Sequence, residues 1–588
     1  MTTINRVAEL RGLVKQDGMA AYISELWDRY QRARSVKLEE WKELRNFIFQ
    51  IDTTKTNVGL LPHSNTTTRP KICQIRDNLL ANYISALFPN DDWLKWQAYS
   101  QDAAVRQKAK TIESYMANKT REGGFRKVVG QLLDDYVTYG NAIAMPTFEA
   151  NYRELANGDV VPSFIGPKAV RISPLDIVFD PLASDFKSTW KIVRSLKTSG
   201  EIAKIAKAYP EQEFWKTALD RRHAIKGAGY GYDDFNKVDA YAVDGFGSLT
   251  EYYNSDTFEV LEFYGDWHSD EDGLHTNRVI TVIDRATVVR NIDMPSWFGT
   301  APIYHVGWRA RPDNMWAMGA LDNLVGMQYR IDHLENAKAD AIDLSILPPL
   351  KVIGDVNKIE WKAGGIIHID GEGDVQEMGK NLNGALMANQ DIQMLQMEME
   401  RMAGAPSEAM GVRSAGEKTA FEVQQLQNAA GRIFQEKVTL FETELLEPLL
   451  NAMLETAVRN MDGSDIIRVS DDMTAFDTFL EITKDDITAN GVLRPVGARH
   501  FGKQAQDLQN LMGLMNSPMG QMIAPHISAK ALTKFAEDVS GLKGYDVFAP
   551  HVAIAEQFEM QKYQQDLAEE AQMEAEVQRD AADAGIDI

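Results

Sequence analysis

The spacing of apolar residues divides the chain into a helical N-terminal part, a β-rich middle and a largely helical remainder. Residues 19–51 carry apolar side chains at helical spacing among charged ones, and residues 70–88, 102–120 and 124–139 are also predicted to be helical. Gly140 follows the last of these helices, where glycine commonly forms the C-terminal cap. The intervening sequence LFPNDDWLKWQAY contains helix breakers and predicts a turn held to the core by its aromatic residues.

The middle of the chain, residues 141–310, has the pattern of β-strands. Short β-branched and aromatic runs are separated by turn residues, with a helical insertion near 199–225 and a glycine-rich exposed loop over 225–248. The runs that predict strands are NAIAMPTF, DVVPSFIG, AVRISPLDIVFDP, TFEVLEFYGDWH and RVITVIDRATVVRNI.

Helical periodicity returns from Gly319 to Ser345, a length of roughly 40 Å for an α-helix. Pro348 and Pro349 end it, a small β-like unit follows, and residues 385–403 predict a returning helix. Two helices that flank an inserted module predict a stalk that carries the module. Methionines cluster at 394–402, where they suit either subunit contacts or an ordinary helix core.

A small polar loop, GAPSEAMGVRSAG, separates that helix from a very long one over residues 418–460. Pro448 lies inside the long helix and removes a hydrogen bond to Glu444, so the sequence predicts a kink there. Beyond it, DIIRVS and TFLEITKDDI predict strands and GVLRPVGARHFG a connecting loop. Residues 503–588 are predicted to be helical with an acidic end.

Length, charge and cysteine content restrict the possible functions. A chain of 588 residues is too long for one core, so at least two domains are expected. The net charge of −23 argues against a protein that grips DNA over a large basic surface, although it permits one that surrounds passing DNA. Cys73 is the single cysteine, which excludes an internal disulfide. No apolar run is long enough for a membrane span, and no membrane partner is expected.

The stretch GVRSAGEKTAFEV resembles a nucleotide-binding P-loop at first sight. A P-loop places lysine directly after its second glycine, whereas Glu417 separates Gly416 from Lys418 here. The segment before it is predicted to be helical, although a P-loop follows a strand. His268 with its acidic neighbours in GDWHSDEDG could bind a cation weakly, but a solvated hairpin turn is the simpler interpretation. No catalytic residue, metal site or cofactor is predicted, so we expect no enzyme.

The run GEKTAFEVQQLQNAAGRIFQEKVTLFETELLEPLLNAML resembles the long helix of tailed-phage portal proteins, the head-to-tail connectors, especially those of short-tailed podoviruses. Lys418 stands where arginine is common in that family. DDYVTYGNAIAMP, RISPLDIVFDP and WAMGALDNLVGMQYRIDHLENAK match other parts of it in the same order. The resemblance implies an α+β portal-type fold with a wing, a two-helix stem, a clip and a helical crown. The implied boundaries are wing 1–318 (helical 1–140, β-rich 141–318), stem helix 319–345, clip 346–384, second stem helix 385–403, tunnel loop 404–417, wing helix and strands 418–495, and crown 496–588.

The resemblance further implies a homo-oligomeric ring, a dodecamer, at the capsid portal vertex of a virion assembled in the host cytoplasm. Double-stranded DNA would pass through its channel without being read. The implied partners are the terminase large subunit, a tail adaptor protein, and the major capsid and scaffolding proteins. The tunnel loop would present Met410, Arg413, Ser414 and Lys418 to DNA. The clip would bind its partners through Lys351, Lys358, Trp361 and Lys362.

Two alternatives remain open at this point. One is a structural oligomer of the virion that is not a portal, and the other is a P-loop-like nucleotide hydrolase acting through Lys418. Images of a ring with an open channel would exclude the first, and ATP turnover lost on Lys418→Ala would support the second.

Overall fold

A computed structural model of the chain divides it into two compact units. The first unit comprises residues 1–465 and 482–497, and the second comprises 466–481 and 498–588. Each is considered by itself. The structure describes residues 18–49, 65, 67–88, 93–99, 103–155, 157–158, 160–208, 215–216, 257–269, 273–283, 285, 287–294, 298–346, 350–353, 374–377, 383–404, 433–461, 463–470 and 477–495.

The predicted helix over residues 19–51 is two helices, α2 (Gly18–Ala33) and α3 (Ser35–Phe49), which break at Arg34. The prediction of one helix was wrong because the tertiary contacts of Arg34 hold the break in place. Its guanidinium donates hydrogen bonds to the carbonyl oxygens of Pro174 at 2.7 Å and Leu175 at 3.0 Å. These long-range partners leave no mark in the local apolar spacing.

Three further helices agree with the sequence prediction: α5 (Lys71–Leu87), α6 (Ala103–Glu122) and α7 (Phe125–Thr138). Between α5 and α6 lies a strand that the sequence analysis missed, β1 (Leu94–Ala98). It pairs in antiparallel fashion with β16 (Gly491–Pro495), which had been predicted as a loop. Each strand has five residues and finds its partner almost 400 residues away, so no local pattern could reveal the pair.

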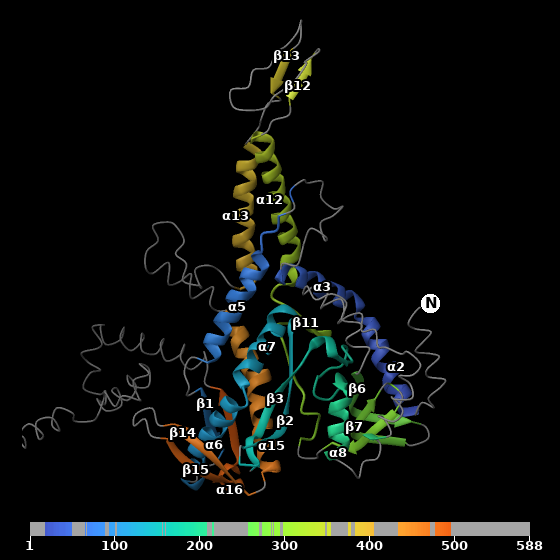
Figure 1. Cartoon of the computed structure of the whole chain (residues 1–588), viewed down its shortest axis with the longest axis vertical. Coiled ribbons are helices and arrows are strands. Elements are labelled where there is room, and N and C mark those ends of the chain that lie inside the picture. The colour runs from blue at the N-terminus through green and yellow to red at the C-terminus, as the bar shows by residue number, and fades with distance from the viewer. Residues whose placement is uncertain are drawn as a thin grey trace, which may run out of the picture. The chain divides into compact units, whose positions relative to one another are not determined.

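Two larger antiparallel sheets and the two-stranded sheet of β10 (Arg309–Arg311) and β11 (Asn314–Met318) form the described β-rich part (Figure 1). In the three-stranded sheet, β2 (Asn141–Glu154) lies between β3 (Val160–Ile172) and β9 (Tyr304–Gly307). The five-stranded sheet has its strands in chain order, and one of them, β5, was not predicted. Its strands are β4 (Ile177–Phe179), β5 (Lys191–Thr198), β6 (Thr257–Ser269), β7 (Gly273–Ile283) and β8 (Thr287–Asp293).

The five-stranded sheet is covered on both faces because successive side chains of a strand point to opposite sides. On β6, Leu261 and Phe263 pack with Ile23 and Trp27 of α2. Phe258 and Val260, of the other parity, pack in a separate cluster that includes Ile202 of α8 (Ser199–Ala208). A third cluster joins this sheet to α3 and β2 through Trp41, Ile143, Phe179 and Trp316.

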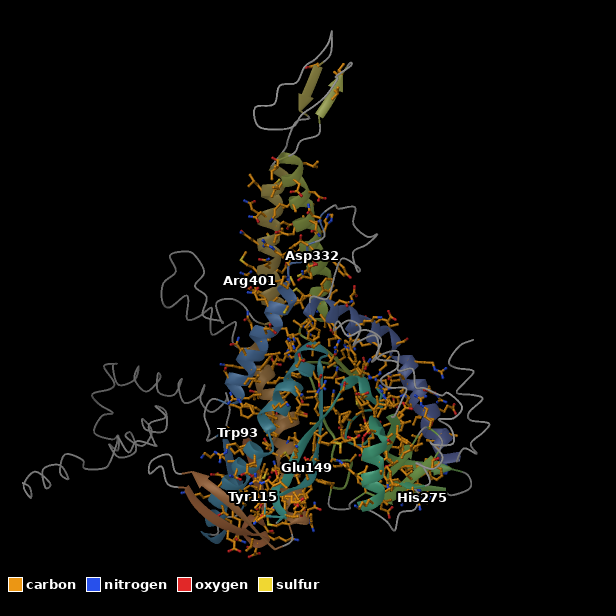
Figure 2. The ribbon with its side chains drawn as sticks, viewed as in Figure 1. Trp93, Tyr115, Glu149, His275, Asp332 and Arg401 are labelled. Carbon is orange, nitrogen blue, oxygen red and sulfur yellow. The ribbon has the colours of Figure 1, made fainter. Side chains whose placement is uncertain are left out.

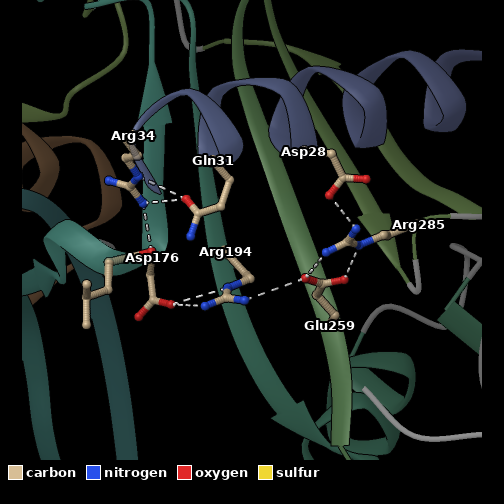
Figure 3. A network of polar contacts seen from close by, with 8 residues as sticks. Asp28, Gln31, Arg34, Asp176, Arg194, Glu259 and Arg285 are labelled. Atoms are coloured by element: carbon tan, nitrogen blue, oxygen red, sulfur yellow. Dashed lines mark hydrogen bonds and ion pairs between the residues drawn. The ribbon is translucent and has the colours of Figure 1, made fainter. Parts of the chain in front are cut away.

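A chain of buried charges lies between α2 and the sheet (Figure 3). Arg285 joins Asp28 of α2 at 2.7 Å to Glu259 of β6 at 2.6 Å. Arg194 of β5 approaches Glu259 at 3.9 Å and hydrogen-bonds Asp176 at 2.9 Å. Burial raises the pKa of Glu259, but the charge of Arg285 and its hydrogen bond outweigh that effect and hold this pKa below its ordinary value. The ion pairs therefore offset the burial cost and fix α2 on the sheet.

The C-terminal part of the first unit contains the described end of the long predicted helix. Residues 433–441 are helical, Glu442–Leu446 form a π turn, and α15 (Glu447–Asn460) has Pro448 in its first turn. The irregular turn lies where the missing N–H of Pro448 interrupts the helical hydrogen bonds. Residues 418–432 lie outside the described part of the chain.

The two strands predicted over DIIRVS and TFLEITKDDI are present, but the second ends earlier than predicted. β14 (Ser464–Ser470) and β15 (Asp477–Thr483) form a two-stranded sheet and include the described residues of the second unit. KDDI, predicted as the end of a strand, is a short helix, α16 (Lys484–Ile487). Thr483 and Asp486 form a capping box, in which the Asp486 carboxylate accepts from the Thr483 backbone N–H at 2.9 Å. This three-residue spacing was a helix-start signal that the strand prediction overlooked.

Candidate assembly site on the paired helices

The start of α12 (Val325–Ile346) is set by a close backbone contact with the end of α7. Gly140 has φ +73°, and a Cβ there would lie 2.3 Å from the carbonyl carbon of Met318. Gly319 lies against the carbonyl oxygens of Val137 and Thr138. Only glycine allows both the left-handed conformation and this approach. The predicted glycine cap is confirmed, and it also explains why the helix begins later than Gly319.

A short 3-10 helix, Asp322–Leu324, leads into α12 and is tied to α3. The Asp322 carboxylate accepts a hydrogen bond from the Gly319 backbone N–H at 3.1 Å and pairs with Lys37 at 2.8 Å. The first turn of this helical segment is thus fixed by both backbone packing and a partly buried ion pair.

The second helix, α13 (Asn383–Met402), runs beside α12 in the opposite direction (Figure 1). Ile392, Met399 and Ala403 are buried. Arg330 of α12 approaches Asp391 of α13 at 3.6 Å, but both side chains are about half exposed, so this pair adds little stability. Packing of the buried apolar residues therefore joins the two helices.

The opposite face of α13 is exposed and carries apolar side chains among polar ones such as Gln390 and Arg401. Met387 is 70% exposed and Met394 is 60% exposed. Residues advance by about 100° each around a helix, so Met394 lies about 200° from Ile392. Leu386 and Met397 extend the same exposed face. We call Leu386, Met387, Met394 and Met397 the outer face of α13. A helix that carries apolar side chains on two opposite sides has surface for a second partner.

Methionine suits such a surface because its side chain is flexible and adapts to its partner. The sequence left open whether the methionines of 394–402 form subunit contacts or a helix core. The structure divides them: Met399 is buried in the core, whereas Met394 and Met397 are exposed. The signal for this division was the spacing along the helix.

The helix pair is held to α5 mainly by polar contacts. Lys71, the first residue of α5, places its ammonium group 2.5 Å from the Glu400 carboxylate of α13, and both side chains are largely buried. Asp332 and Gln328 of α12, which are fully buried, accept hydrogen bonds from the backbone N–H of Arg69 just before α5 and of Ile72 in its first turn, respectively. Figure 2 labels Asp332 on α12 and Arg401 on α13. Burial raises the pKa of Asp332 to about 6, although two hydrogen bonds to its carboxylate oppose the shift.

The residues predicted to contact DNA and partner proteins can be placed only in part. Lys351 is exposed in β12 (Leu350–Ile353) and lies opposite Gln376 of β13 (Asp374–Glu377). Lys358, Trp361 and Lys362 lie outside the described residues. Met410, Arg413, Ser414 and Lys418 also lie outside them, as does the P-loop-like stretch. Their predicted roles remain predictions.

The other candidate site lies around His268. There the described Asp266 stabilises the hairpin. The Asp266 carboxylate accepts a hydrogen bond from the backbone N–H of Asn277 at 2.8 Å, across the β6–β7 hairpin. Residues 270–272 are not described. Within the part of the chain that the structure describes, no three or more His, Cys, Asp or Glu side chains are grouped to hold a metal ion. No described helix is both long and apolar enough to cross a membrane.

Comparison with known protein families identifies a match. A family model described as phage SU10 portal protein matches residues 97–583. The matched residues include both paired helices, both of the larger sheets and α15. No curated protein matches the chain.

Proposed function

The chain belongs to the phage SU10 portal protein family and is a tailed-phage portal protein of the podovirus type; on this basis, we propose that its copies form a ring, a dodecamer, through which double-stranded DNA enters and leaves the capsid. The ring would occupy one vertex of the capsid. In this proposal residues 319–345 and 385–403, which contain most of α12 and α13, are the stem, residues 346–384 the clip, 404–417 the tunnel loop and 496–588 the crown. The remainder, 1–318 and 418–495, is the wing.

The outer face of α13 is the observation that carries this proposal. A closed ring needs two different contact surfaces on each subunit, so that each copy binds the next. On α13 one apolar side is buried within the chain, and the other remains open for a neighbouring copy. The exposed Leu344 and Ile346 at the end of α12 offer apolar surface on the partner helix. We propose that the stem helices of adjacent copies meet through these residues.

The net charge of −23 supports a channel that DNA passes through without being held. Double-stranded DNA carries about one negative charge per 1.7 Å of its axis, so a strongly basic channel would bind it tightly and resist sliding. An acidic protein with a few cations at the channel avoids this. In the proposal, Arg413 and Lys418 form rings of positive charge that contact phosphates without reading bases.

We further propose that the clip docks the terminase large subunit during packaging and a tail adaptor afterwards. Lys351 on β12 is exposed and available for such a contact. ATP hydrolysis would belong to terminase, and the portal protein would supply no catalytic group. The major capsid and scaffolding proteins would contact the ring during assembly in the host cytoplasm.

Two experiments test this function. Negative-stain images of the purified full chain should show rings with an open channel, and a filament or a closed particle would contradict the proposal. Deletion of residues 407–414 should leave the rings intact but reduce packaging or genome retention. Unchanged packaging and unchanged retention would remove the tunnel loop from the account while leaving the ring in place.

A further inference from the structure

An extended segment of the chain lies along α12 and is held by the side chains of that helix. We call Asn65 and Thr67–Pro70 the strap. Three polar residues of α12 beneath it, Gln328, Asp332 and Asn336, are at most 2% exposed. Buried polar side chains need hydrogen-bond partners, and these three find theirs in the backbone of the strap and the first turn of α5.

The hydrogen bonds follow a regular register. The backbone N–H groups of Asn65, Thr67 and Arg69 donate to the side-chain oxygens of Asp340 at 3.0 Å, Asn336 at 2.8 Å and Asp332 at 3.0 Å, respectively. Gln328 then donates to the carbonyl oxygen of Arg69 at 2.5 Å and accepts from the N–H of Ile72 at 3.3 Å. As the strap advances along the chain, its partners move back along α12, so the two run antiparallel.

This register has a simple geometric cause. Four residues of an α-helix rise about 6 Å, and two residues of an extended chain advance about 6.6 Å. Side-chain oxygens at every fourth position of a helix are therefore spaced like the backbone N–H groups of every second residue in an extended chain. Gln328, Asp332, Asn336 and Asp340 form such a series, which we call the track. The track recognises extended backbone much as a neighbouring strand would.

The strap is attached mainly through its backbone. Thr67, Arg69 and Pro70 are exposed, and the strap contains no large apolar side chain that could anchor it in the core. Its side-chain contacts are polar: Asn65 donates to Asp340 and Asp343, and Arg69 lies 3.1 Å from Glu335 with its own side chain about half exposed. Segments that bury little apolar surface open at low free-energy cost.

The track also has an unsatisfied atom. The Asp332 Oδ1 atom accepts from both Arg69 and Gln328, whereas the Oδ2 atom of this carboxyl is buried with no hydrogen-bond partner. A buried acceptor without a partner weakens the bound state relative to one in which water can reach it. The hydrogen bonds therefore fix the register of the docked strap, while the unsatisfied acceptor lowers the free energy needed to undock it.

The strap connects two parts of the molecule whose relative attachment it can control. It continues directly into α5 at Lys71, and Lys71 pairs with Glu400 of α13. We propose that the track is a binding site for extended peptide backbone, with the strap as its built-in ligand, and that the strap opens locally to loosen the α12–α13 pair from α5. This inference goes beyond the proposed function, because it holds for a single chain whether or not a ring forms.

Hydrogen exchange of the full chain, resolved to single amides, tests both parts. We expect the Thr67 and Arg69 amides to be protected, yet to exchange at least about tenfold faster than those of Leu79 and Tyr83 in α5, because local opening costs less than unfolding. If all four amides exchange only when the whole protein unfolds, the proposed local opening of the strap is wrong. Absence of protection at Thr67 and Arg69 would overturn its docking.

Single substitutions distinguish the loss of a hydrogen bond of the track from a general loss of stability. Asn336→Ala should accelerate exchange at Thr67 by about tenfold, the factor that corresponds to one lost hydrogen bond. Asp332→Asn, which keeps an oxygen acceptor for Arg69, should preserve protection there. Arg330→Ala, on an exposed face of the same helix, should change neither amide. Equal effects of Asn336→Ala and Arg330→Ala at Thr67 would overturn the register, and intact ring formation in all variants would leave the proposed function untouched.

Discussion

The five-stranded sheet and the α12–α13 pair differ in how far their apolar surfaces are buried within one chain. The sheet is covered by α2 on one face and by α8 and a second apolar cluster on the other, and the buried Arg194 and Glu259 belong to a network of ion pairs. The helix pair buries one side of α13 and leaves an apolar side exposed. The sheet buries both of its apolar faces within one chain, whereas the helix pair leaves apolar residues that a neighbouring copy would cover in the proposed ring.

The two regions also differ in how their helices are attached to the rest of the chain. α2 is fixed by apolar packing and by the partly buried ion pair of Asp28 with Arg285. The helix pair packs Tyr329 on Phe47 of α3, and an ion pair and a series of hydrogen bonds join it to α5 and to the strap. Apolar packing resists small displacements of a helix, while a short series of hydrogen bonds can open and re-form. The comparison therefore predicts a rigid sheet region and an adjustable helix pair.

The largest expected effect is loss of the buried charge that joins the sheet to α2. Glu259→Ala leaves Arg285 and Arg194 without their shared carboxylate, and breaking a buried pair in this way costs about 3–5 kcal/mol. The free energy of unfolding from denaturant titration measures it. Glu25→Ala, which removes the exposed partner of Arg29, should cost less than about 1 kcal/mol. Similar costs for the two variants would show that the network does not fix α2.

A somewhat smaller effect is expected where the helix pair begins. Gly140→Ala forces a side chain into both a left-handed conformation and the backbone of Met318, which should cost about 3 kcal/mol. Gly158→Ala has the same backbone strain at φ +87° with nothing within 4 Å, and should cost about 1 kcal/mol. Thermal or denaturant unfolding compares them. Equal costs would mean that the α7–α12 contact relaxes without penalty.

A third effect concerns the pH dependence of the strap. Burial raises the pKa of Asp332 from 3.8 to about 6, with Glu335 adding to the shift, and hydrogen bonds from Arg69 and Gln328 opposing it. Burial and the neighbouring Glu43 raise the pKa of Tyr329 of α12, and the charge of Asp332 adds to that shift. A raised folded pKa means that docking is strongest when the carboxyl is protonated and weakens as pH rises through 6.

Protection of the Arg69 amide, corrected for intrinsic exchange, should therefore be about tenfold greater at pH 5 than at pH 8. Asp332→Asn should remove this dependence, because the amide does not titrate. An unchanged pH dependence in that variant would assign the effect to another group.

The sequence predicted the helices with strong periodicity and most strands with clear alternation, and failed where the deciding contacts are distant. β1 and β16 are short and pair only with each other within the described chain. The break at Arg34 depends on carbonyl groups 140 residues away. β5 was missed because its sequence, KIVRSLKT, mixes buried apolar residues with the charged residues Lys191 and Arg194, which are themselves buried.

The candidate site shows the same limit. The apolar periodicity of residues 319–345 predicted a helix but did not indicate a role for the polar series Gln328, Asp332, Asn336 and Asp340 at four-residue spacing. That spacing is visible in the sequence, but it becomes meaningful only once the side chains are known to be buried against an extended segment. The methionines of α13 were identified as a cluster, while their division between a buried and an exposed side required the structure.

In the proposed ring, the outer face of α13 binds a neighbouring copy of the chain. The most direct test is the molecular mass in solution of the wild-type protein, Met394→Glu and Met394→Leu at matched concentrations. A charge buried without a partner in every interface is costly, so Met394→Glu should shift the mass from ring to free subunit. Met394→Leu keeps the surface apolar and should retain the ring. Rings of unchanged mass and stability in Met394→Glu would contradict the account.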